Sequence, residues 1–230
     1  MNKTEIIENA CKVETDDEYT SFVETFECND MVLVSILCAW LRNTNEDILW
    51  VAEKIVNERM SGAPTAYILK YNGVESVVGS LHKNISERNY DNLMFVLHRI
   101  ILLQGGVRNT LDNYLESPRH KCRYAHDALA LMLGYNTCFP NVNNKGTFYR
   151  YNLILYWLVY KFKLWEDINS DCLLLPCNDF IFENAKKYGV TKKNMKSTLS
   201  NTIKLTDISK KWFGKKDFWK MYEFLTFYKE

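Results

Sequence analysis

The residues of this chain with the clearest potential for chemistry are a neighbouring amide and carboxylate, Asn178 and Asp179. They follow the apolar segment Cys172–Cys177, and both are residue types that commonly begin helices. A carboxylate at a helix N-terminus is stabilised in its charged form by the helix dipole. Such a group can stabilise positive charge that develops on a substrate. Helix capping is the alternative role for both residues, and composition alone favours it.

Histidine and cysteine are the next candidates. Cys122 and His126 lie one helical turn apart, with His120 nearby, and metal ligands use this spacing. A structural zinc site usually has four such ligands, often as Cys-x-x-Cys pairs, and the sequence contains no such pair. It also contains no glycine-rich phosphate loop and no G-x-S-x-G elbow. We therefore predict neither a metal nor a cofactor.

Charge is distributed unevenly along the chain. Residues 1–60 carry five Lys and Arg against thirteen Asp and Glu, whereas residues 181–230 carry twelve Lys against five acids. A basic C-terminal quarter can bind phosphates while the acidic quarter faces away. This asymmetry favours a nucleic acid as a partner. The alternative is that the lysines are simply solvated residues of helical surfaces.

Aromatic side chains crowd the segment from Tyr149 to Trp165. Together they can form a pocket that stacks on a nucleic-acid base. Tyr149, Leu153, Trp157 and Tyr160 also recur three or four residues apart, as on the buried stripe of a helix. Core packing is therefore the favoured interpretation of most of them.

Hydrophobic spacing and few breaking residues predict an all-α protein, since four prolines and nine glycines are few for a sheet protein. Asp30 is placed to cap a helix that is apolar nearly all round. Thr147 is placed to cap an aromatic helix, and residues 136–146 read as a loop. The expected helices are 30–41, 46–60, 73–83, 90–104, 110–115, 124–135, 148–162, 178–189, and two more from about 191 and about 216.

We predict one compact helical domain over 1–230, with lobes at 30–135 and at 1–29 plus 136–230. The longest apolar run, Met31–Leu41, is too short to cross a bilayer, so we expect no membrane association. The N-terminus lacks a charged-then-apolar signal peptide, and the seven cysteines are not closely paired. These features predict a cytoplasmic protein with reduced thiols.

Three segments, in the right order, resemble the helix-hairpin-helix DNA glycosylase superfamily. Leu33–Ile48 looks like its early helix and the loop that enters the duplex. Gly146–Leu153, with Trp157 and Trp165, is similar to a poorly characterised bacterial branch that carries Lys-Arg-x-Asn, then Arg-Trp, then a further Trp. Leu175-Pro-Cys-Asn-Asp179 is similar to that branch's Pro-Leu-Asp-Thr-His, in which the Asp is catalytic. The resemblance implies a two-lobed helical bundle that acts on double-stranded DNA.

The chain departs from this pattern in several places. Asn178 stands where the catalytic Asp belongs, with Asp179 one residue later, and Tyr149 stands where the branch has Lys. The Leu-Pro-Gly-x-Gly hairpin and the four-cysteine iron–sulfur loop have no counterpart. An amide cannot carry the charge or accept the proton that glycosidic hydrolysis requires, and such a loss typically costs about 2–4 orders of magnitude in rate.

The resemblance implies a role for each matching residue. Asn178 and Asp179 would face a flipped nucleotide. The base pocket would be formed by Tyr149, Asn152, Trp157 and Trp165. DNA contacts would come from Arg42, Asn43, Lys145, Gly146, Arg150, Lys192, Lys193 and Lys196. These assignments predict a protein that flips or modifies a base.

Three other functions remain open at this stage. One is a catalytically inactive DNA-binding protein. Another is a phage-type thymine base-modification enzyme, similar to the alpha-glutamyl/putrescinyl thymine pyrophosphorylases, whose likeness is one of fold. The last is a helical protein-interaction domain that uses the acidic N-terminal face.

Overall fold

The computed structural model describes residues 1–15, 17–42, 49–72, 80–82, 85–134, 139, 146–192 and 194–229. Its contacts divide the chain into two compact units. Unit 1 consists of Met1–Asp17 and Asn144–Glu230, and unit 2 of Glu18–Asn143. The sequence predicted a lobe over residues 30–135, whereas unit 2 begins 12 residues earlier and ends 8 residues later.

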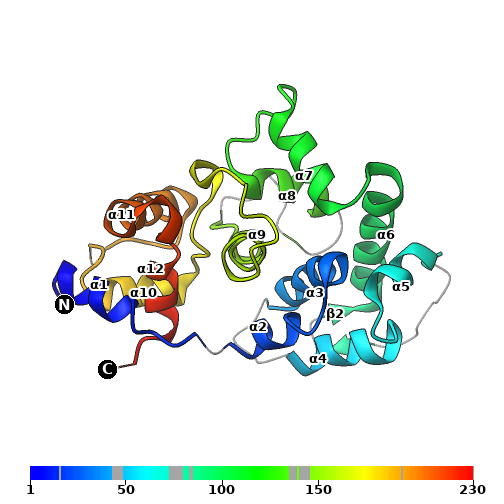
Figure 1. Cartoon of the computed structure of the whole chain (residues 1–230), viewed down its shortest axis with the longest axis horizontal. Helices are drawn as coiled ribbons and strands as arrows, with labels where there is room; N and C mark the ends of the chain where they lie inside the picture. The colour runs from blue at the N-terminus through cyan, green and yellow to red at the C-terminus, as the bar shows by residue number, and fades with distance from the viewer. Residues whose placement is uncertain are drawn as a thin grey trace. The chain divides into compact units, whose positions relative to one another are not determined.

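In its described residues, unit 2 consists of helices and one short hairpin (Figure 1). Its helices are α2 (Glu18–Val23), α3 (Cys28–Leu41), α4 (Leu49–Lys54), the π-helix η1 (Ile55–Arg59), α5 (Pro64–Lys70), α6 (Glu87–Gln104), α7 (Val107–Glu116) and α8 (Ala125–Leu133). The strands β1 (Ser80–His82) and β2 (Ile85–Ser86) pair antiparallel. All of α3 from Val32 to Leu41 is buried, as its unbroken apolar sequence predicts.

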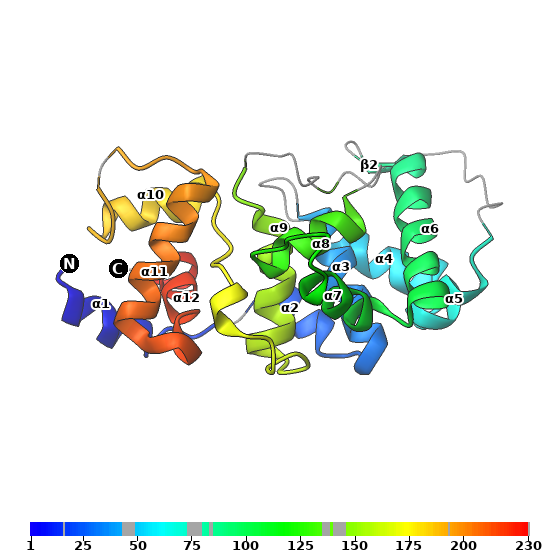
Figure 2. The same cartoon turned by 90° about the horizontal axis from the view of Figure 1, so that it is seen from above.

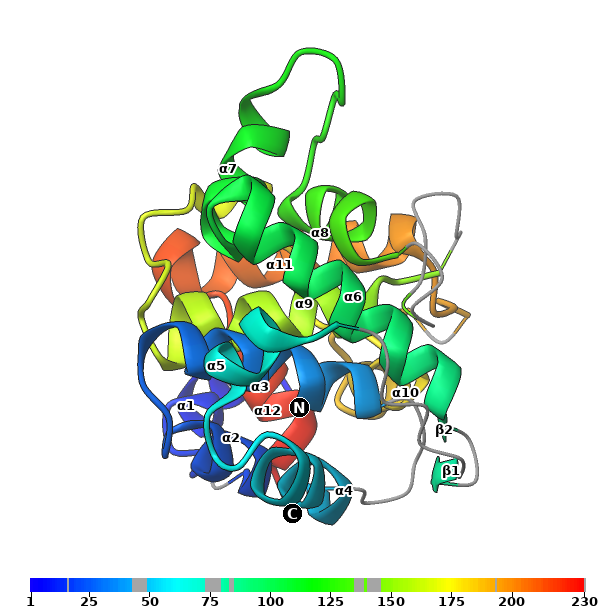
Figure 3. The same ribbon diagram turned by 90° about the vertical axis from the view of Figure 1, so that its right-hand side faces the viewer.

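Helix α3 packs against α2, α4 and α5, while α6, α7 and α8 lie side by side in Figure 3. Asp30 does not cap α3, although the sequence suggested this role. Its carboxylate instead accepts hydrogen bonds from the backbone N–H of Thr65, at 2.7 Å, and from the Thr65 hydroxyl. Asp30 therefore satisfies the first turn of α5, a helix that the sequence analysis did not predict.

Unit 1 is built around α12 (Lys220–Phe227), which contacts α1 (Lys3–Ala10), α10 (Asp179–Lys187) and α11 (Leu199–Asp217). Figure 2 shows α10, α11 and α12 together. The remaining elements are α9 (Tyr149–Leu155), the π-helix η2 (Tyr156–Lys161) and the 3-10 helix η3 (Ser170–Cys172). The buried residues Met221–Leu225 of α12 form the centre of this unit.

Several predicted helix boundaries are correct because their signals are local. Helix α6 ends at Gly105, whose φ of 74° is left-handed, and α10 is followed by Gly189 with φ 76°. Other predictions are wrong. Ser80–His82 form a strand within the expected helix 73–83, whose residues 73–79 and 83 lie outside the described residues. The helix expected from about Thr191 begins at Leu199, where Thr198 accepts the capping hydrogen bond.

The cap expected at Thr147 is also wrong, because α9 is preceded by Phe148 in a left-handed conformation without a side-chain cap. Most of the loop expected over 136–146 lies outside the described residues. The all-α class is confirmed at the level of helical content, with the β1–β2 hairpin as an addition. Among the described helices, none combines the length and apolarity needed to cross a bilayer.

Gly214 interrupts α11 with φ 83° and ψ 167°, a conformation that residues with a Cβ rarely adopt. A Cβ at this position would meet no atom within 4 Å, so backbone strain alone decides the effect of a side chain. We predict that Gly214→Ala lowers the free energy of unfolding of unit 1 by about 1–3 kcal/mol. Urea denaturation followed by tryptophan fluorescence measures this change. The control, Ser200→Ala at an exposed position, should change it by less than about 0.5 kcal/mol, and equal stability of both variants would contradict the prediction.

Candidate functional site

The segment before α10 is held in an extended conformation on the surface of α11. Leu173–Cys177 are buried, and the backbone N–H of Leu175 donates to the hydroxyl of Thr206 at 3.0 Å. That hydroxyl donates in turn to the carbonyl of Thr202 at 2.9 Å, within α11. These two hydrogen bonds fix the position at which α10 begins.

Asn178 is the N-cap of α10. Its side-chain oxygen accepts a hydrogen bond from the backbone N–H of Ile181 at 3.0 Å, and its backbone carbonyl accepts from Phe182 at 3.1 Å. Asp179, the first residue of α10, is exposed. The amide oxygen of Asn178 is therefore committed to the helix, whereas the carboxylate of Asp179 is open to solvent at the positive end of the helix dipole.

The residues expected to form a base pocket are largely buried. Asn152 and Trp157 have no exposed surface, Trp165 is 4% exposed, and Tyr149 is half-buried at the start of α9. The amide nitrogen of Asn152 donates to the carbonyl of Thr147 at 3.2 Å, while its amide oxygen has no partner among the described residues. A base would reach Asn152 or Trp157 only after local movement of the chain.

The residues expected to contact DNA are found in different environments. Lys192 and Lys196 are exposed between α10 and α11, and Gly146 is half-buried. Arg150 is only 7% exposed, so its guanidinium does not offer an open phosphate contact. In unit 2, half-buried Arg42 lies over the ring of Tyr19, with 4.7 Å between its guanidinium carbon and the ring centre. Asn43, Lys145 and Lys193 lie outside the described residues.

Unit 1 also contains a buried polar cluster that the sequence analysis missed. The carboxylate of Glu223 accepts a hydrogen bond from the hydroxyl of Tyr156 at 2.9 Å and pairs with the ammonium group of Lys161 at 2.9 Å. Lys161 also donates to the hydroxyl of Thr15. Glu223 is 6% exposed, inside an otherwise apolar turn of α12. A single acid in the run Met-Tyr-Glu-Phe-Leu was the available signal.

The surroundings of this cluster keep its phenols protonated. Burial, followed by the nearby charge of Glu223, raises the pKa of both Tyr156 and Tyr160. Protonated phenols are hydrogen-bond donors, which is what a buried carboxylate requires. The ring of Tyr156 packs edge-on against Tyr222, with ring centres 4.8 Å apart. The cluster is satisfied and enclosed, so it acts as a brace rather than as an open site.

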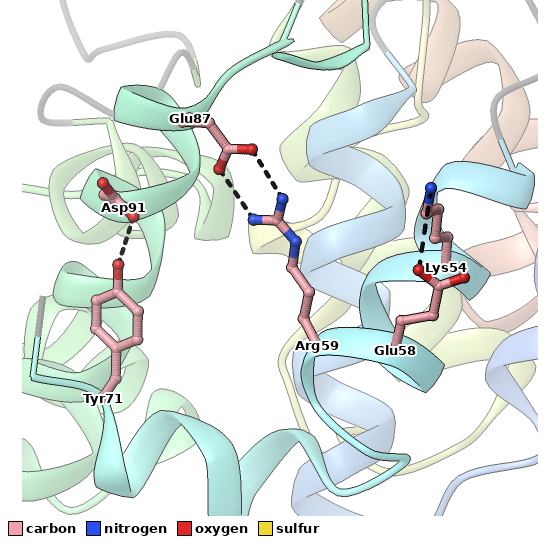
Figure 4. A network of polar contacts seen from close by, with 6 residues as sticks. All are labelled: Lys54, Glu58, Arg59, Tyr71, Glu87 and Asp91. Carbon is pink, nitrogen blue, oxygen red and sulfur yellow. Dashed lines mark hydrogen bonds and ion pairs between the residues drawn. The ribbon is translucent and has the colours of Figure 1, made fainter. Parts of the chain in front are cut away.

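A second brace joins η1 to α6 in unit 2 (Figure 4). Arg59 donates two hydrogen bonds to the carboxylate of Glu87, at 2.9 and 2.8 Å, and lies over the ring of Tyr90. On the same helix, Asp91 accepts a hydrogen bond from the hydroxyl of Tyr71 at 2.6 Å. Lys54 and Glu58, also drawn there, are an exposed pair at 3.9 Å. The Arg59–Glu87 pair raises the pKa of Arg59, which therefore stays charged.

Across the described ranges, His, Cys, Asp and Glu side chains do not gather in any group of three or more that could hold a metal ion. Cys122 and His126 belong to different environments: Cys122 is half-buried, and His126 is fully buried beside Asp127. Hydrogen bonds and the charge of His126 lower the pKa of Asp127 against the opposing effect of burial. Asp127 accepts from the backbone N–H of Tyr124 at 2.9 Å and so begins α8.

Comparison with known proteins assigns the chain to one family. Residues 20–224 match the family described as "Protein of unknown function (DUF2400)". This match covers most of the chain and extends across both units, so the chain belongs to that family. No curated protein and no solved structure matches the chain.

The buried cluster predicts an asymmetry between two substitutions. Glu223→Ala leaves half-buried Lys161 without its carboxylate partner and should lower the free energy of unfolding by about 3 kcal/mol, the low end of the range for buried pairs. Tyr156→Phe removes one hydrogen bond and keeps the ion pair, so it should cost only about 1 kcal/mol. Chemical denaturation of both variants measures the difference. Similar losses in the two variants would show that the ion pair is not the dominant interaction.

The thiol of Cys177, directly before Asn178, is predicted to be unreactive. Burial raises its pKa to about 12, so almost none of it is thiolate at neutral or mildly alkaline pH. Iodoacetamide at pH 8 should therefore modify the exposed residues Cys11 and Cys28 first and leave Cys177 intact, as mass spectrometry of proteolytic peptides would show. The difference should disappear in urea, which serves as the control. Equal labelling of the three thiols in the folded protein would refute the assignment.

Proposed function

We propose that this protein acts on DNA as a relative of the helix-hairpin-helix glycosylases, with the start of α10 facing the target nucleotide. The observation that supports this most directly is the position of Asn178 and Asp179. They follow a buried, hydrogen-bonded extended segment and open a nine-residue helix. This arrangement is compatible with the resemblance to the superfamily's catalytic segment and supports the proposal.

The two residues differ in the chemistry they can perform. Asn178 is neutral and its oxygen already caps α10, so it cannot stabilise a cationic sugar as a carboxylate does. Asp179 carries a carboxylate and is exposed. Adjacent residues of a helix point in directions about 100° apart, so a reaction at this site depends on whether Asp179 reaches the substrate. Base flipping would supply the nucleotide, because the target atoms are inaccessible inside a duplex.

The charge of unit 1 supports a polyanionic partner. Lys192 and Lys196 are exposed between α10 and α11, and the exposed lysines of α11 are Lys204, Lys211, Lys215 and Lys216. Of these, Lys215 pairs with Asp171 at 2.7 Å. Exposed lysines bind phosphates without sequence preference and provide affinity that depends on salt.

A second candidate is a DNA-binding protein without base-release activity. The hydrogen bond between the Asn178 side chain and Ile181 favours it, because this is the ordinary structural role of an N-cap asparagine. Binding without chemistry would then be the whole function of unit 1.

DNA binding is the first prediction to be tested. The protein should bind a fluorescent duplex at low salt, and the affinity should fall steeply as salt rises from about 50 to 200 mM. The double variant Lys192→Ala/Lys196→Ala should bind more weakly, and the salt slope should fall by about 1 for each lost phosphate contact. Lys12→Ala, an exposed lysine at the end of α1, is the matched control and should leave affinity unchanged. Absence of duplex binding at low salt would overturn both functions.

Base release distinguishes the two candidates. Duplexes that carry oxidised, alkylated, deaminated or hypermodified bases are incubated with the protein and examined for free base and abasic sites. Release that is lost in Asp179→Ala but kept in Asn178→Ala would identify Asp179 as the catalytic carboxylate. Release only in Asn178→Asp, a substitution that preserves the cap, would show that this scaffold lost a catalytic acid. Glu183→Gln, an exposed acid of the same helix, is the control.

A further inference from the structure

A cavity in unit 2 lies where α6 ends and α7 runs past the turn that follows it. Its volume is about 580 Å³, within the range of roughly 300–1,000 Å³ that is typical of small-molecule sites. The residues that determine its chemistry are Gln104, Asn109, Asn113, Tyr114, Ser117 and His120. None of these residues was assigned to DNA contact, and all of them lie in unit 2.

One wall of the cavity is aromatic. The rings of Tyr114 and His120 are 4.5 Å apart between centres and are tilted by 49°. His120 is exposed and Tyr114 is half-buried, so the pair is anchored at one side and accessible at the other. Exposed rings of this kind are the surfaces on which unpaired bases stack.

Amide side chains form another part of the wall. The Asn109 amide nitrogen donates to the carbonyl of Gln104 at 2.7 Å, which fixes its direction. The side-chain amides of Asn113 and Gln104 have no hydrogen-bond partner among the described residues. Asparagine and glutamine recognise bases because an amide offers a donor and an acceptor side by side, as the edge of adenine does.

The third component is positive charge on the turn between α7 and α8. Arg119, Lys121 and Arg123 are all exposed on it, and the same turn carries His120 of the cavity wall. Figure 3 shows this turn between α7 and α8. The exposed acid Glu116 at the end of α7 is outnumbered by these cations, and two further acids have partners of their own. Asp112 is paired with Arg108 on its own helix, at 2.9 Å, and Asp127 accepts hydrogen bonds from backbone N–H groups at the start of α8.

We propose that this cavity binds a nucleotide. Its base lies against His120 and Tyr114, its edge meets Asn113 and Gln104, and its phosphate is held by Arg119 and Lys121. Rings and amides line the cavity, and exposed cations flank His120 in the chain, so the three kinds of group match the three parts of a nucleotide. The ligand is either a free nucleotide or an unpaired unit of a strand, because both present the same groups. The site shares no residue with the one in unit 1, so each stands without the other.

Isothermal titration calorimetry of the full chain, with ATP and with the single strand d(A)8 as ligands, tests the proposal. We expect at least one of them to bind, and His120→Ala and Arg119→Ala each to weaken that binding by roughly tenfold. Both residues are exposed, so the variants should remain folded, and circular dichroism verifies this. Lys70→Ala, an exposed lysine of the same unit, is the charge control and should bind as the parent protein does. Binding of ATP alone assigns the site to free nucleotides, and binding of d(A)8 alone assigns it to strands.

Adenosine and inorganic triphosphate complete the experiment. Each should bind far more weakly than ATP or d(A)8, since each supplies only part of the ligand. Triphosphate that binds as tightly as ATP would show a plain anion site and overturn the proposal. So would binding that is unchanged in both His120→Ala and Arg119→Ala, or no binding of either ligand. Duplex binding that persists in these variants would leave the function proposed for unit 1 unaffected.

Discussion

A glutamate carboxylate enclosed in unit 1 must keep a positive partner, and this requirement connects three separate parts of the sequence. Glu223 is on α12, Lys161 ends η2, and Thr15 follows α1. A buried charge without a partner costs several kcal/mol, so these elements have to assemble together. The same helix α12 also contacts α1, α10 and α11. The start of α10 is positioned separately, by the hydrogen bonds from Leu175 to Thr206 and from Thr206 to Thr202 of α11.

Both units contain an ion pair at the end of a π-helix. In each, a π-helix ends in a basic residue, Arg59 or Lys161, which pairs with a glutamate of another helix and lies near a tyrosine ring. π-Helices are rare and are frequent at functional sites, because their wider turn changes the direction in which side chains point. Here the redirected side chains are cross-braces. The groups available for ligands are elsewhere, at helix starts and on exposed turns.

Each unit has one candidate ligand-binding site: the start of α10 in unit 1 and the cavity beside α7 in unit 2. At α10 the side chain of Asn178 accepts a hydrogen bond from the helix N-terminus. In the glycosylase resemblance the same residue stands where the catalytic acid would be, so a capping role and a catalytic role would fall on one side chain. At the cavity the side-chain amides of Asn113 and Gln104 make no hydrogen bond within the described chain. A ligand can therefore be bound there without weakening a helix.

The sequence by itself predicted those features that depend on interactions between residues close together in the chain. The unbroken apolar run of α3, the glycine stop of α6 and the asparagine cap of α10 each act within a few residues, so helical class and the position of Asn178 and Asp179 could be predicted. Tertiary structure decided what depends on distant partners. Asp30 caps a helix 35 residues away, Glu223 pairs 62 residues from Lys161, and packing buried Arg150 and Trp157 rather than exposing them. The His120 ring, which drew attention as a metal ligand, acquired an aromatic partner only through the turn that places it beside Tyr114.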